Sequence, residues 1–363
     1  MRTYALLLVA SAAAAAVACT SSSSETPNDV ASDDGGTDPT QGPGAGDGGD
    51  AGTNAPLAEP LSATTFAYVR HVANDHDELV AHDLATGAER TITDLREGDT
   101  YHDIAGFSIS PDRRSVVLAT SYGAEQADLF TVARRVFKLG VDGKGFVRLT
   151  PTFKNNGGGS PSYFIDVRDP VFSKDGATVY YTFGESNRGF GGTRTWSVSA
   201  AGGSLPSLID SNASCSDIGQ ASVGANGALL LVQSTCQNEA DEGFFAYPAT
   251  GEPVKVHGTG SSNTVSPVGW APDGSGFLVA LSDQNSVGSL HFFTGETQNM
   301  QLLVPGTRDV SFVRGAAMTA DGKIVYCVRA GNGATDLRLL DGTVTPATDT
   351  ALTTDGKSCD PRY

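Results

Sequence analysis

Positively charged residues are scarce in this sequence. Its 363 residues include 24 Lys and Arg against 41 Asp and Glu, which gives a formal net charge of −17 at pH 7. Proteins that bind nucleic acid normally carry a basic patch, so we predict that nucleic acid is not a partner. Helix-period apolar patterns are also scarce, and this excludes a coiled coil or a long-helix protein.

Common catalytic and metal-binding motifs are missing as well. The sequence contains no G-x-S-x-G, H-E-x-x-H or C-x-x-C motif. The first absence excludes the nucleophile elbow of an α/β-hydrolase domain. The six histidines do not follow the spacing of zinc ligands. We therefore expect no catalytic residue that a motif alone would identify.

A short apolar run near the N-terminus is typical of a signal peptide. Residues 4–18 follow Arg2 and end at Ala18-Cys19, and they are too few to span a membrane comfortably. The small residues before Cys19 resemble a bacterial lipobox, which implies a diacylglycerol on Cys19 and cleavage before it. Ordinary secretory cleavage after Ala18 is the alternative. Thr20 stands where Asp would retain a Gram-negative lipoprotein at the inner membrane, which favours the outer membrane.

The next segment has the composition of a flexible tether. Residues 20–60 contain eight Gly, five Pro and eight acidic residues, with no Lys or Arg. Such a segment has too few apolar side chains to offset the entropy lost on ordering. The sequence thus divides into a lipoprotein signal peptide (1–18), a disordered acidic Gly/Ser/Pro-rich tether (19–60) and a folded domain (61–363).

The folded domain contains a repeat marked by a tight turn. Asp-Gly and Asn-Gly are strong hairpin signals because both residue types tolerate positive φ. Successive turns lie 63, 51, 47, 48 and 34 residues apart, and each of the first five precedes an apolar strand-like run and a second hairpin. The six turns are 110–113, 173–176, 224–227, 271–274, 319–322 and 353–356.

Four strands in about 50 residues are typical of a propeller blade. Residues 66–95 supply three strands and lack the innermost one, while residues 349–356 look like an innermost strand with nothing after it. We therefore predict an all-β fold, a six-bladed β-propeller of four-stranded antiparallel blades. Pairing of the N- and C-terminal segments in one blade would close the ring and remove its open edges.

An apolar residue recurs three positions before the Asp or Asn of each turn. We interpret this recurrence as packing between blades, without a functional role. The residues are Ile109, Phe172, Val223, Trp270, Met318 and Leu352.

Ser110-Pro111-Asp112 and Ala271-Pro272-Asp273-Gly274, each followed by an apolar strand and a hairpin, resemble the repeat of TolB-type propellers. The resemblance covers residues 66–356. It implies a propeller, WD-repeat-like in its blade architecture, and is weak evidence for function. TolB itself carries an α/β domain before its propeller, and here only the tether occupies that place, so TolB's envelope role does not transfer directly.

The connections opposite the tight turns are predicted to be long. They span 71–78, 121–135, 151–164, 184–194 and 234–243. Long loops on a rigid scaffold are common binding sites, and aromatic and Arg side chains are common interface anchors. We expect this face to bind; a merely solvated face is the alternative. The loops carry Tyr122, Phe153, Tyr163, Phe164 and Phe190 with Arg134, Arg135, Arg188 and Arg194.

Three aspartates recur nine residues before a turn, where a chain enters an innermost strand. These are Asp103, Asp166 and Asp217. Residues at this position line the mouth of a propeller channel. Together they can hold Ca²⁺, which prefers several oxygen ligands; otherwise each caps its own backbone turn. The neighbouring candidates for the channel mouth are His102, Arg168, Asp169 and Arg314.

Four cysteines remain after Cys19, an even number that suggests disulfides in an exported domain. Cys215 precedes an innermost strand and Cys236 follows the next one. Both are expected on the long-loop face of one blade, so they are predicted to pair. Cys327 and Cys359 then pair by elimination and fasten the C-terminal segment near the ring closure.

Two functions fit these expectations. The first is a monomeric binding or scaffolding lipoprotein of the cell envelope that presents its long-loop face to a protein, peptide or glycan. The second is a hydrolase or lyase that uses Asp, His and Arg at the channel mouth. A deep pocket containing His102, Asp166 and Arg168 would favour the enzyme, and a shallow aromatic face would favour a partner. Apart from Ca²⁺, no cofactor is predicted.

Overall fold

The computed structural model describes most of the folded domain. The described residues are 57–363 without 98–99, 123–125, 128–129, 133, 151–162, 188–189, 204–206, 210–214, 225–226, 248–252, 258–263, 283–287, 295–298, 306–309, 312–314, 331 and 343–346. The predicted signal peptide, Cys19 and almost all of the tether lie outside this range. No helix in the described part is long and apolar enough to cross a membrane.

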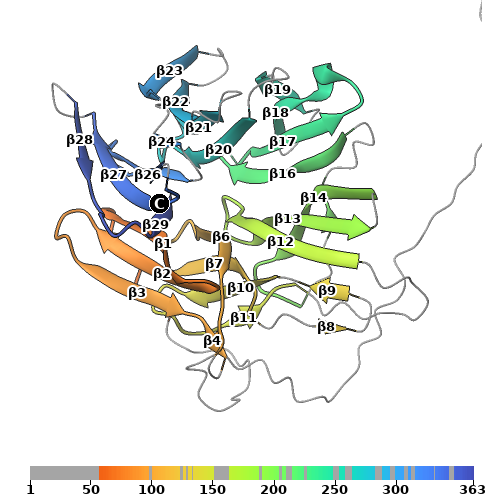
Figure 1. Ribbon diagram of the computed structural model, residues 1–363, viewed down its shortest axis with the longest axis horizontal. Helices are drawn as coiled ribbons and strands as arrows, with labels where there is room; N and C mark the ends of the chain where they lie inside the picture. The colour runs from red at the N-terminus through yellow and green to blue at the C-terminus, as the bar shows by residue number, and fades with distance from the viewer. Residues whose placement is uncertain are drawn as a thin grey trace, which may run out of the picture. The chain divides into compact units, whose positions relative to one another are not determined.

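Six small antiparallel sheets form a propeller ring (Figure 1), and two cavities along its centre mark the channel. In chain order the blades are 1 (β1, Thr65–Ala73; β2, His76–Asp83; β3, Glu89–Asp94; β29, Ser358–Arg362), 2 (β6, Ile104–Ile109; β7, Ser115–Thr120; β10, Arg135–Gly140; β11, Val147–Arg148), 3 (β12, Tyr163–Phe172; β13, Thr178–Asn187; β14, Phe190–Ser199; β15, Ser207–Leu208), 4 (β16, Cys215–Val223; β17, Leu229–Cys236; β18, Gly243–Tyr247; β19, Val254–His257), 5 (β20, Thr264–Trp270; β21, Gly276–Ser282; β22, Gly288–Thr294; β23, Asn299–Val304) and 6 (β24, Val310–Ser311; β25, Ala316–Met318; β26, Ile324–Ala330; β27, Thr335–Asp341; β28, Thr348–Ala351).

Short elements decorate the blades on the side of the predicted long loops. β4 (Arg96–Glu97) pairs with β5 (Thr100–Tyr101), and β8 (Gln126–Ala127) pairs with β9 (Phe130–Val132). β9 also runs parallel to β12, and one parallel bridge joins β14 to β16. A 3₁₀ turn (η1, Glu239–Asp241) follows β17. Two predicted loops are mostly strand, because 71–78 is a tight β1–β2 hairpin and 184–194 is the β13–β14 hairpin.

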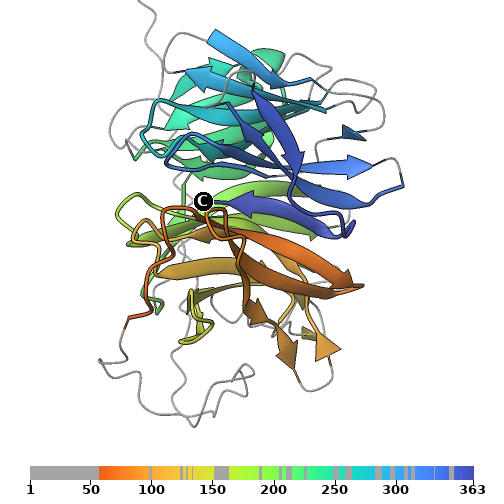
Figure 2. The same cartoon turned by 90° about the vertical axis from the view of Figure 1, so that its left-hand side faces the viewer.

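The N- and C-terminal segments close the ring in one blade, as predicted, but the closing strand is not the predicted one. β29 pairs antiparallel with β1 through Val69–Cys359 and Arg70–Ser358 and completes blade 1. Figure 2 shows this dark-blue C-terminal strand against the orange first strand. The predicted innermost strand, 349–356, is wrong: β28 at its start is the outer strand of blade 6, and the 353–356 turn comes before the closing strand.

The tight turns form as their sequence predicts. In the 173–176 turn, the hydroxyl of Ser173 donates to Asp175 Oδ1 (2.6 Å), which also accepts the Ala177 N–H (3.0 Å). Gly176 has φ 71° and donates its N–H to the Ser173 carbonyl (2.9 Å). Asp112, Asp273 and Asp321 accept hydrogen bonds in the same way in their own turns.

Five innermost strands are interrupted at mid-length by a bulge. A bulge bends a strand and redirects its side chains. Gly106 (φ 123°) and Asp169 (φ 49°) lie against each other at the bulges of β6 and β12. A Cβ added to Gly106 would lie 3.1 Å from the Asp169 Cα atom. The register shifts fall within 104–107, 168–171, 219–222, 267–269 and, against β1, 359–362.

Both predicted disulfides are present. Cys215 and Cys236 are directly opposite in the β16–β17 ladder, with Cα atoms 3.9 Å apart. Cys327 of β26 is bonded to Cys359 of β29, with Cα atoms 5.1 Å apart. The second bond fastens the closing strand to blade 6.

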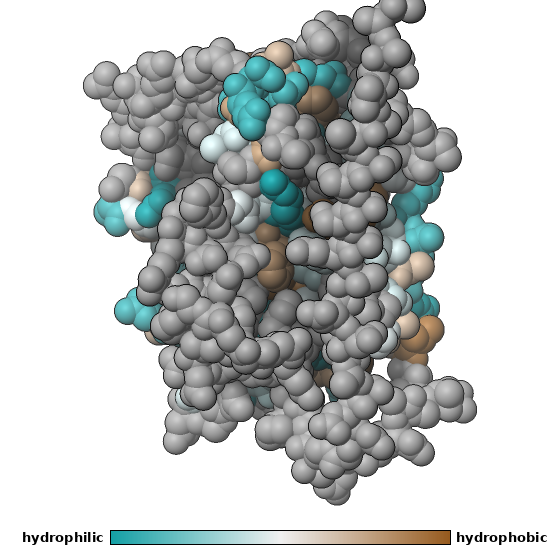
Figure 3. Space-filling view, turned by 90° about the vertical axis from the view of Figure 1, so that its right-hand side faces the viewer, coloured by the Kyte–Doolittle hydropathy of each residue, from teal (hydrophilic) through white to brown (hydrophobic). Residues whose placement is uncertain are grey.

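Apolar residues on alternate strand positions pack between the blades, as the period-2 pattern requires. Of the described large apolar side chains, the exposed ones are Leu57, Val147, Leu208 and Leu302. In the side view of Figure 3, the brown residues lie in small separate groups among hydrophilic ones. The outer wall that the structure describes therefore offers no broad apolar patch, and the channel is the main concave feature.

Candidate functional site

The two ends of the channel are built from opposite ends of the innermost strands. We call the end near Asp103 and Asp166, where these strands begin, the connection-face mouth. We call the end near Ile109 and Phe172, beside the tight turns, the tight-turn mouth. Each opens into a cavity, of about 660 Å³ at the connection face and about 330 Å³ at the tight-turn face. Asp169 and Arg362 line both cavities and lie between them.

The connection-face mouth is strongly charged. Blades 1, 2 and 3 supply its lining, which holds six carboxylates, three guanidinium groups and one imidazole, so its net charge is negative. The acids are Asp75, Asp77, Asp103, Asp166, Asp169 and Asp360, and the bases are Arg134, Arg168, Arg362 and His71.

Arg134 joins two of the predicted aspartates. Its Nε and Nη2 donate to Asp103 Oδ2 (2.9 and 2.6 Å), and its Nη1 donates to Asp166 Oδ1 (2.8 Å). Asp103 Oδ1 accepts the Ser121 N–H (3.0 Å), which fixes the carboxylate to the end of β7. Burial favours a higher pKa for Asp103, but its hydrogen bonds to Arg134 and Ser121 outweigh burial and lower that pKa below its usual range.

His71 and Asp77 form a hydrogen-bonded pair on the β1–β2 hairpin. His71 Nδ1 lies 2.6 Å from Asp77 Oδ1, and Asp77 Oδ2 accepts the Ile104 N–H at 2.7 Å. The Asp77 side chain is buried, whereas that of His71 is 44% exposed and borders the cavity. The hydrogen bond to Asp77 raises the pKa of His71, against the opposing effect of burial. The buried carboxylate thus orients an imidazole toward the channel.

Arg168 differs from Arg134 in its surroundings. No described residue hydrogen-bonds or forms an ion pair with its guanidinium. Arg168 also borders a smaller cavity of about 190 Å³, whose other lining residues include Thr182, Thr193 and Ser234. A guanidinium beside hydroxyl groups is suited to hold an anionic or polar group of a ligand.

The structure brings four sequence-predicted residues together at this mouth: Asp103, Asp166, Arg168 and Asp169. Sequence reasoning missed His71, Asp75, Asp77, Asp360 and Arg362, and it listed Arg134 only among the loop arginines. The alternation of β1 and β2 held the missing signal, because His71 and Asp77 are cross-strand partners whose side chains share one face. Their segment was interpreted as a loop, which concealed that pairing.

Three other predictions are corrected by burial. His102 is not at the mouth; it is buried, with its ring 5.2 Å from that of Tyr122. Tyr122 is not a surface anchor; it is 1% exposed and packs edge-on against Phe137 and Phe146. Arg135 is also fully buried.

Several candidates fall on parts that the structure describes incompletely. Arg314 lies outside the described residues. The backbones of Tyr163, Phe164, Asp217 and Phe190 belong to β12, β16 and β14, and their side chains lie outside the description. These five residues stay predictions.

The proposed calcium site also stays a prediction. Two of its three carboxylates, Asp103 and Asp166, accept hydrogen bonds from Arg134 in this structure. A cation bound by both would have to displace that guanidinium. Elsewhere in the described part, His76, Glu78 and Asp94 bring potential ligand atoms within 4.8 Å of one another on blade 1.

Comparisons with known proteins identify the fold. No protein-family model matches the sequence, and no curated protein is similar to it in sequence. TolB from Acinetobacter baumannii has a similar structure, with a TM-score of 0.59 and 16% identity over 82% of this chain and 66% of the TolB chain.

Weaker structural similarity extends to enzymes. An oligogalacturonate lyase from Vibrio parahaemolyticus gives a TM-score of 0.49 and 11% identity over 81% of this chain and 76% of the lyase. A puromycin-hydrolyzing peptidase from Mycobacterium tuberculosis gives a TM-score of 0.47 and 16% identity over 79% of this chain and 47% of the peptidase. The chain spans 66% of the TolB chain and less than half of the peptidase chain, and it has the six-bladed β-propeller fold of TolB.

Proposed function

We propose that this protein is an exported, monomeric binding protein whose connection-face mouth receives a basic segment of a protein or peptide in the bacterial cell envelope. The observation that carries the proposal is the lining of that mouth, where six carboxylates face three guanidinium groups around a cavity of about 660 Å³. A cavity of this size lies within the ~300–1,000 Å³ range of ligand sites. Complementary charge favours encounter with a basic partner.

Asp75 is the most accessible of these carboxylates. It is exposed at the tip of the β1–β2 hairpin, and no described residue hydrogen-bonds to its side chain. Asp103 and Asp166, by contrast, already share Arg134. An incoming lysine or arginine would therefore meet Asp75 first. A glycan is a less favoured partner, because Tyr122, one of the aromatic residues predicted for this face, is buried.

Export and anchoring belong to the same proposal. Two disulfides support an oxidising compartment. A lipid on Cys19 would then place the propeller at the outer membrane, with the acidic tether as a spacer. Metabolic labelling with a fatty-acid analogue tests the anchor: the wild-type protein should be labelled, and the Cys19→Ala variant should not. A labelled Cys19→Ala protein would contradict the lipid assignment.

In-cell crosslinking tests the binding face. A photoreactive amino acid replaces Asn74, which lines the connection-face mouth, or Lys144, which is exposed on the β10–β11 turn. The full chain is then irradiated in its own envelope. We expect a discrete adduct from position 74 that disappears in an Asp75→Lys background, and no such adduct from position 144. Equal adducts at both positions would contradict the proposed face.

A catalytic role is a second candidate because of one observation, the His71–Asp77 pair at 2.6 Å beside the cavity. An imidazole oriented by a carboxylate can act as general acid or base in a hydrolase or lyase. The described lining supplies no hydroxyl or thiol nucleophile next to it, so water or a substrate proton would be its target. Turnover of ester or uronate substrates that His71→Gln abolishes would support this candidate, and identical turnover by both proteins would reject it.

A further inference from the structure

The tight-turn mouth differs in chemistry from the connection-face mouth. Its cavity of about 330 Å³ takes lining residues from all six blades. The lining is mainly apolar, and its charged side chains are three cationic ones and one acidic one, Asp169. The two ends of one channel therefore carry opposite net charge.

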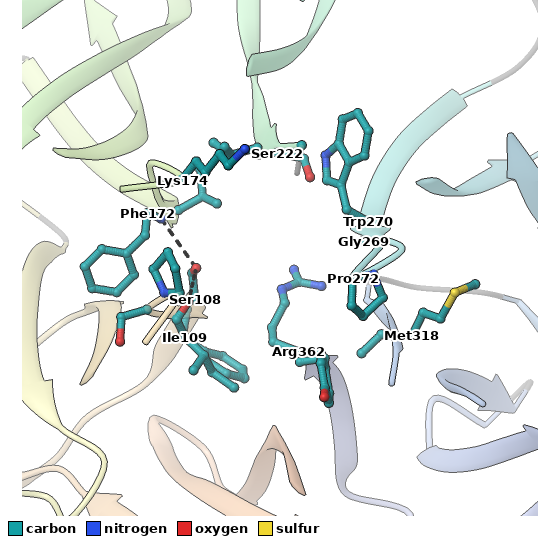
Figure 4. Close-up of a pocket in the computed structure, with 18 of the residues that line it drawn as sticks. Ser108, Ile109, Phe172, Lys174, Ser222, Gly269, Trp270, Pro272, Met318 and Arg362 are labelled. Atoms are coloured by element: carbon teal, nitrogen blue, oxygen red, sulfur yellow. Dashed lines mark hydrogen bonds between the residues drawn. The ribbon is translucent and has the colours of Figure 1, made fainter. Parts of the chain in front are cut away.

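The apolar lining comes from the residue that recurs three positions before each turn. In the five complete blades this residue borders the cavity, so the interpretation as packing between blades alone is incomplete for Ile109, Phe172, Val223, Trp270 and Met318. Figure 4 shows Trp270, Met318 and Phe172 placed around the opening. Trp270 and Met318 are only partly buried. They offer an aromatic and a thioether surface to a ligand.

Blade 1 breaks this pattern because its closing strand contributes Arg362. Figure 4 shows the guanidinium of Arg362 directed into the opening, across from Lys174 and Ser222. Lys174 forms no ion pair with any residue that the structure describes. The third cation, Arg113, is committed elsewhere, since it donates to the carbonyls of Leu61 and Ser62. Figure 4 shows Arg362 and Lys174 directed at the cavity, and Arg362 Nη1 also donates to the Pro361 carbonyl (3.4 Å).

Trp270 adds an observation that points to a bound group. Its indole Nε1 is shielded from solvent and has no hydrogen-bond acceptor among the described residues. Buried donors are normally paired, because an unpaired donor loses its hydrogen bonds to water without a replacement. Figure 4 places this indole beside Ser222 at the edge of the opening. Because the atom is shielded from solvent, a ligand oxygen held by Lys174 and Arg362 could accept this N–H only after the indole turns toward the cavity.

We propose that the tight-turn mouth is a second binding site, for a small carboxylate with an aromatic or branched aliphatic body. The carboxylate would lie between Arg362 and Lys174, and the apolar body would lie against Trp270 and Met318. The cavity is at the small end of the ~300–1,000 Å³ range of ligand sites, which favours a small molecule over a folded partner. The argument for this site does not use the partner proposed for the connection-face mouth, although Arg362 and Asp169 line both cavities.

Trp270 makes the site directly observable. The chain has two tryptophans, Trp196 and Trp270, so a Trp196→Phe protein reports on this mouth alone. The probes are 2-naphthoate and its neutral analogue 2-naphthamide, titrated into the full chain. We expect 2-naphthoate to change the Trp270 emission until it saturates the site. It should bind at least about ten-fold tighter than 2-naphthamide, because only its carboxylate forms charged hydrogen bonds with Arg362 and Lys174.

Variants assign the binding to the named side chains. Arg362→Gln and Lys174→Gln should each weaken 2-naphthoate binding about ten-fold and leave 2-naphthamide binding unchanged. Lys144→Gln, on an exposed turn, is the matched control and should bind like the parent. Ser222→Asp, which places a negative charge in the opening, should exclude 2-naphthoate even if Arg362→Gln fails to fold. Equal binding of the two probes, or unchanged binding in all three pocket variants, would overturn the proposal.

Discussion

Asp103 accepts two hydrogen bonds from the guanidinium of Arg134, at 2.9 and 2.6 Å, across the gap between β6 and the segment entering β10. The same guanidinium reaches Asp166 of blade 3. One arginine therefore links blades 2 and 3 at the connection-face mouth. This arginine holds two of the six carboxylates of the connection-face mouth in place.

Replacing Arg134 by Met should destabilise the propeller. The change leaves two part-buried carboxylates without their cation. Solvent partly screens the ion pair, because the side chains of Arg134 and Asp103 are 28% and 21% exposed. We expect a loss of about 1–2 kcal/mol in the free energy of unfolding, measured by urea denaturation at pH 7. Adding Asp103→Asn and Asp166→Asn to Arg134→Met should restore part of it. No change in Arg134→Met would contradict the role of this arginine.

The same pair predicts a pH dependence. The folded-state pKa of Asp103 is lowered, so its stabilising contribution is present above the unfolded pKa of about 3.9 and is lost as pH falls through the folded value. The stability difference between wild type and Arg134→Met should therefore shrink below about pH 4. A difference that stays constant from pH 7 to pH 3 would contradict this assignment.

His71 predicts a pH dependence of the opposite sign. Its hydrogen bond to Asp77 raises its folded-state pKa above the usual value of about 6.5. The stabilisation is fully present below pH 6.5 and is lost as pH rises through the folded value. His71→Gln should remove this component, which we expect to be below about 1 kcal/mol because the ring is 44% exposed. An NMR titration that places the pKa of His71 at or below 6.5 would reject the pairing.

The two disulfides should differ in what they hold. Each closes a loop of similar length, with sequence separations of 21 and 32, so removing either should cost about 3–4 kcal/mol in the chain-entropy model. Removal of the Cys327–Cys359 bond should also expose the closing strand. Hydrogen exchange should then accelerate in β29 for Cys327→Ala/Cys359→Ala but not for Cys215→Ala/Cys236→Ala. Equal protection of β29 in both variants would show that strand pairing alone closes the ring.

Close approach of two backbones makes Gly106 sensitive to a methyl group. Its φ is 123°, and an added Cβ would lie 3.1 Å from the Asp169 backbone. Gly106→Ala should cost about 2 kcal/mol or more, whereas Gly87→Ala, at φ 70° with open space around it, should cost only about 1 kcal/mol. Thermal unfolding of both variants measures this. A smaller loss at Gly106 than at Gly87 would contradict the tight β6–β12 contact.

Local chemistry explains which parts of this molecule the sequence could predict. Asp-Gly turns and alternating apolar residues report on nearest neighbours, so the blades around Asp175 and Asp273 follow from the chain alone. The cysteine pairs follow from their positions in those blades. The closing strand does not, because Ser358–Arg362 carries no apolar residue apart from Cys359 and Pro361 and resembles a tail.

The site was harder to predict than the fold. The aspartates at 103 and 166 recur in the repeat, and they do reach the channel. His102 is adjacent in sequence, but its ring is buried against Tyr122 in the segment between β5 and β6. Arg134 comes from a connection outside the repeat, so periodicity could not place it between two carboxylates. Arg134 lies about thirty residues from each of these aspartates in sequence, and only the fold brings the three side chains together.

The proposed function requires the connection-face mouth to discriminate between peptides by their charge. The measurement is the dissociation constant of the full chain for two labelled peptides that differ only in carrying Lys or Glu at the same positions. We predict that the Lys peptide binds at least ten-fold tighter, that salt weakens it, and that Asp75→Asn reduces its affinity while Glu59→Gln, an exposed carboxylate outside the mouth, does not. Equal affinity for both peptides, or tighter binding of the Glu peptide, would contradict the proposed function.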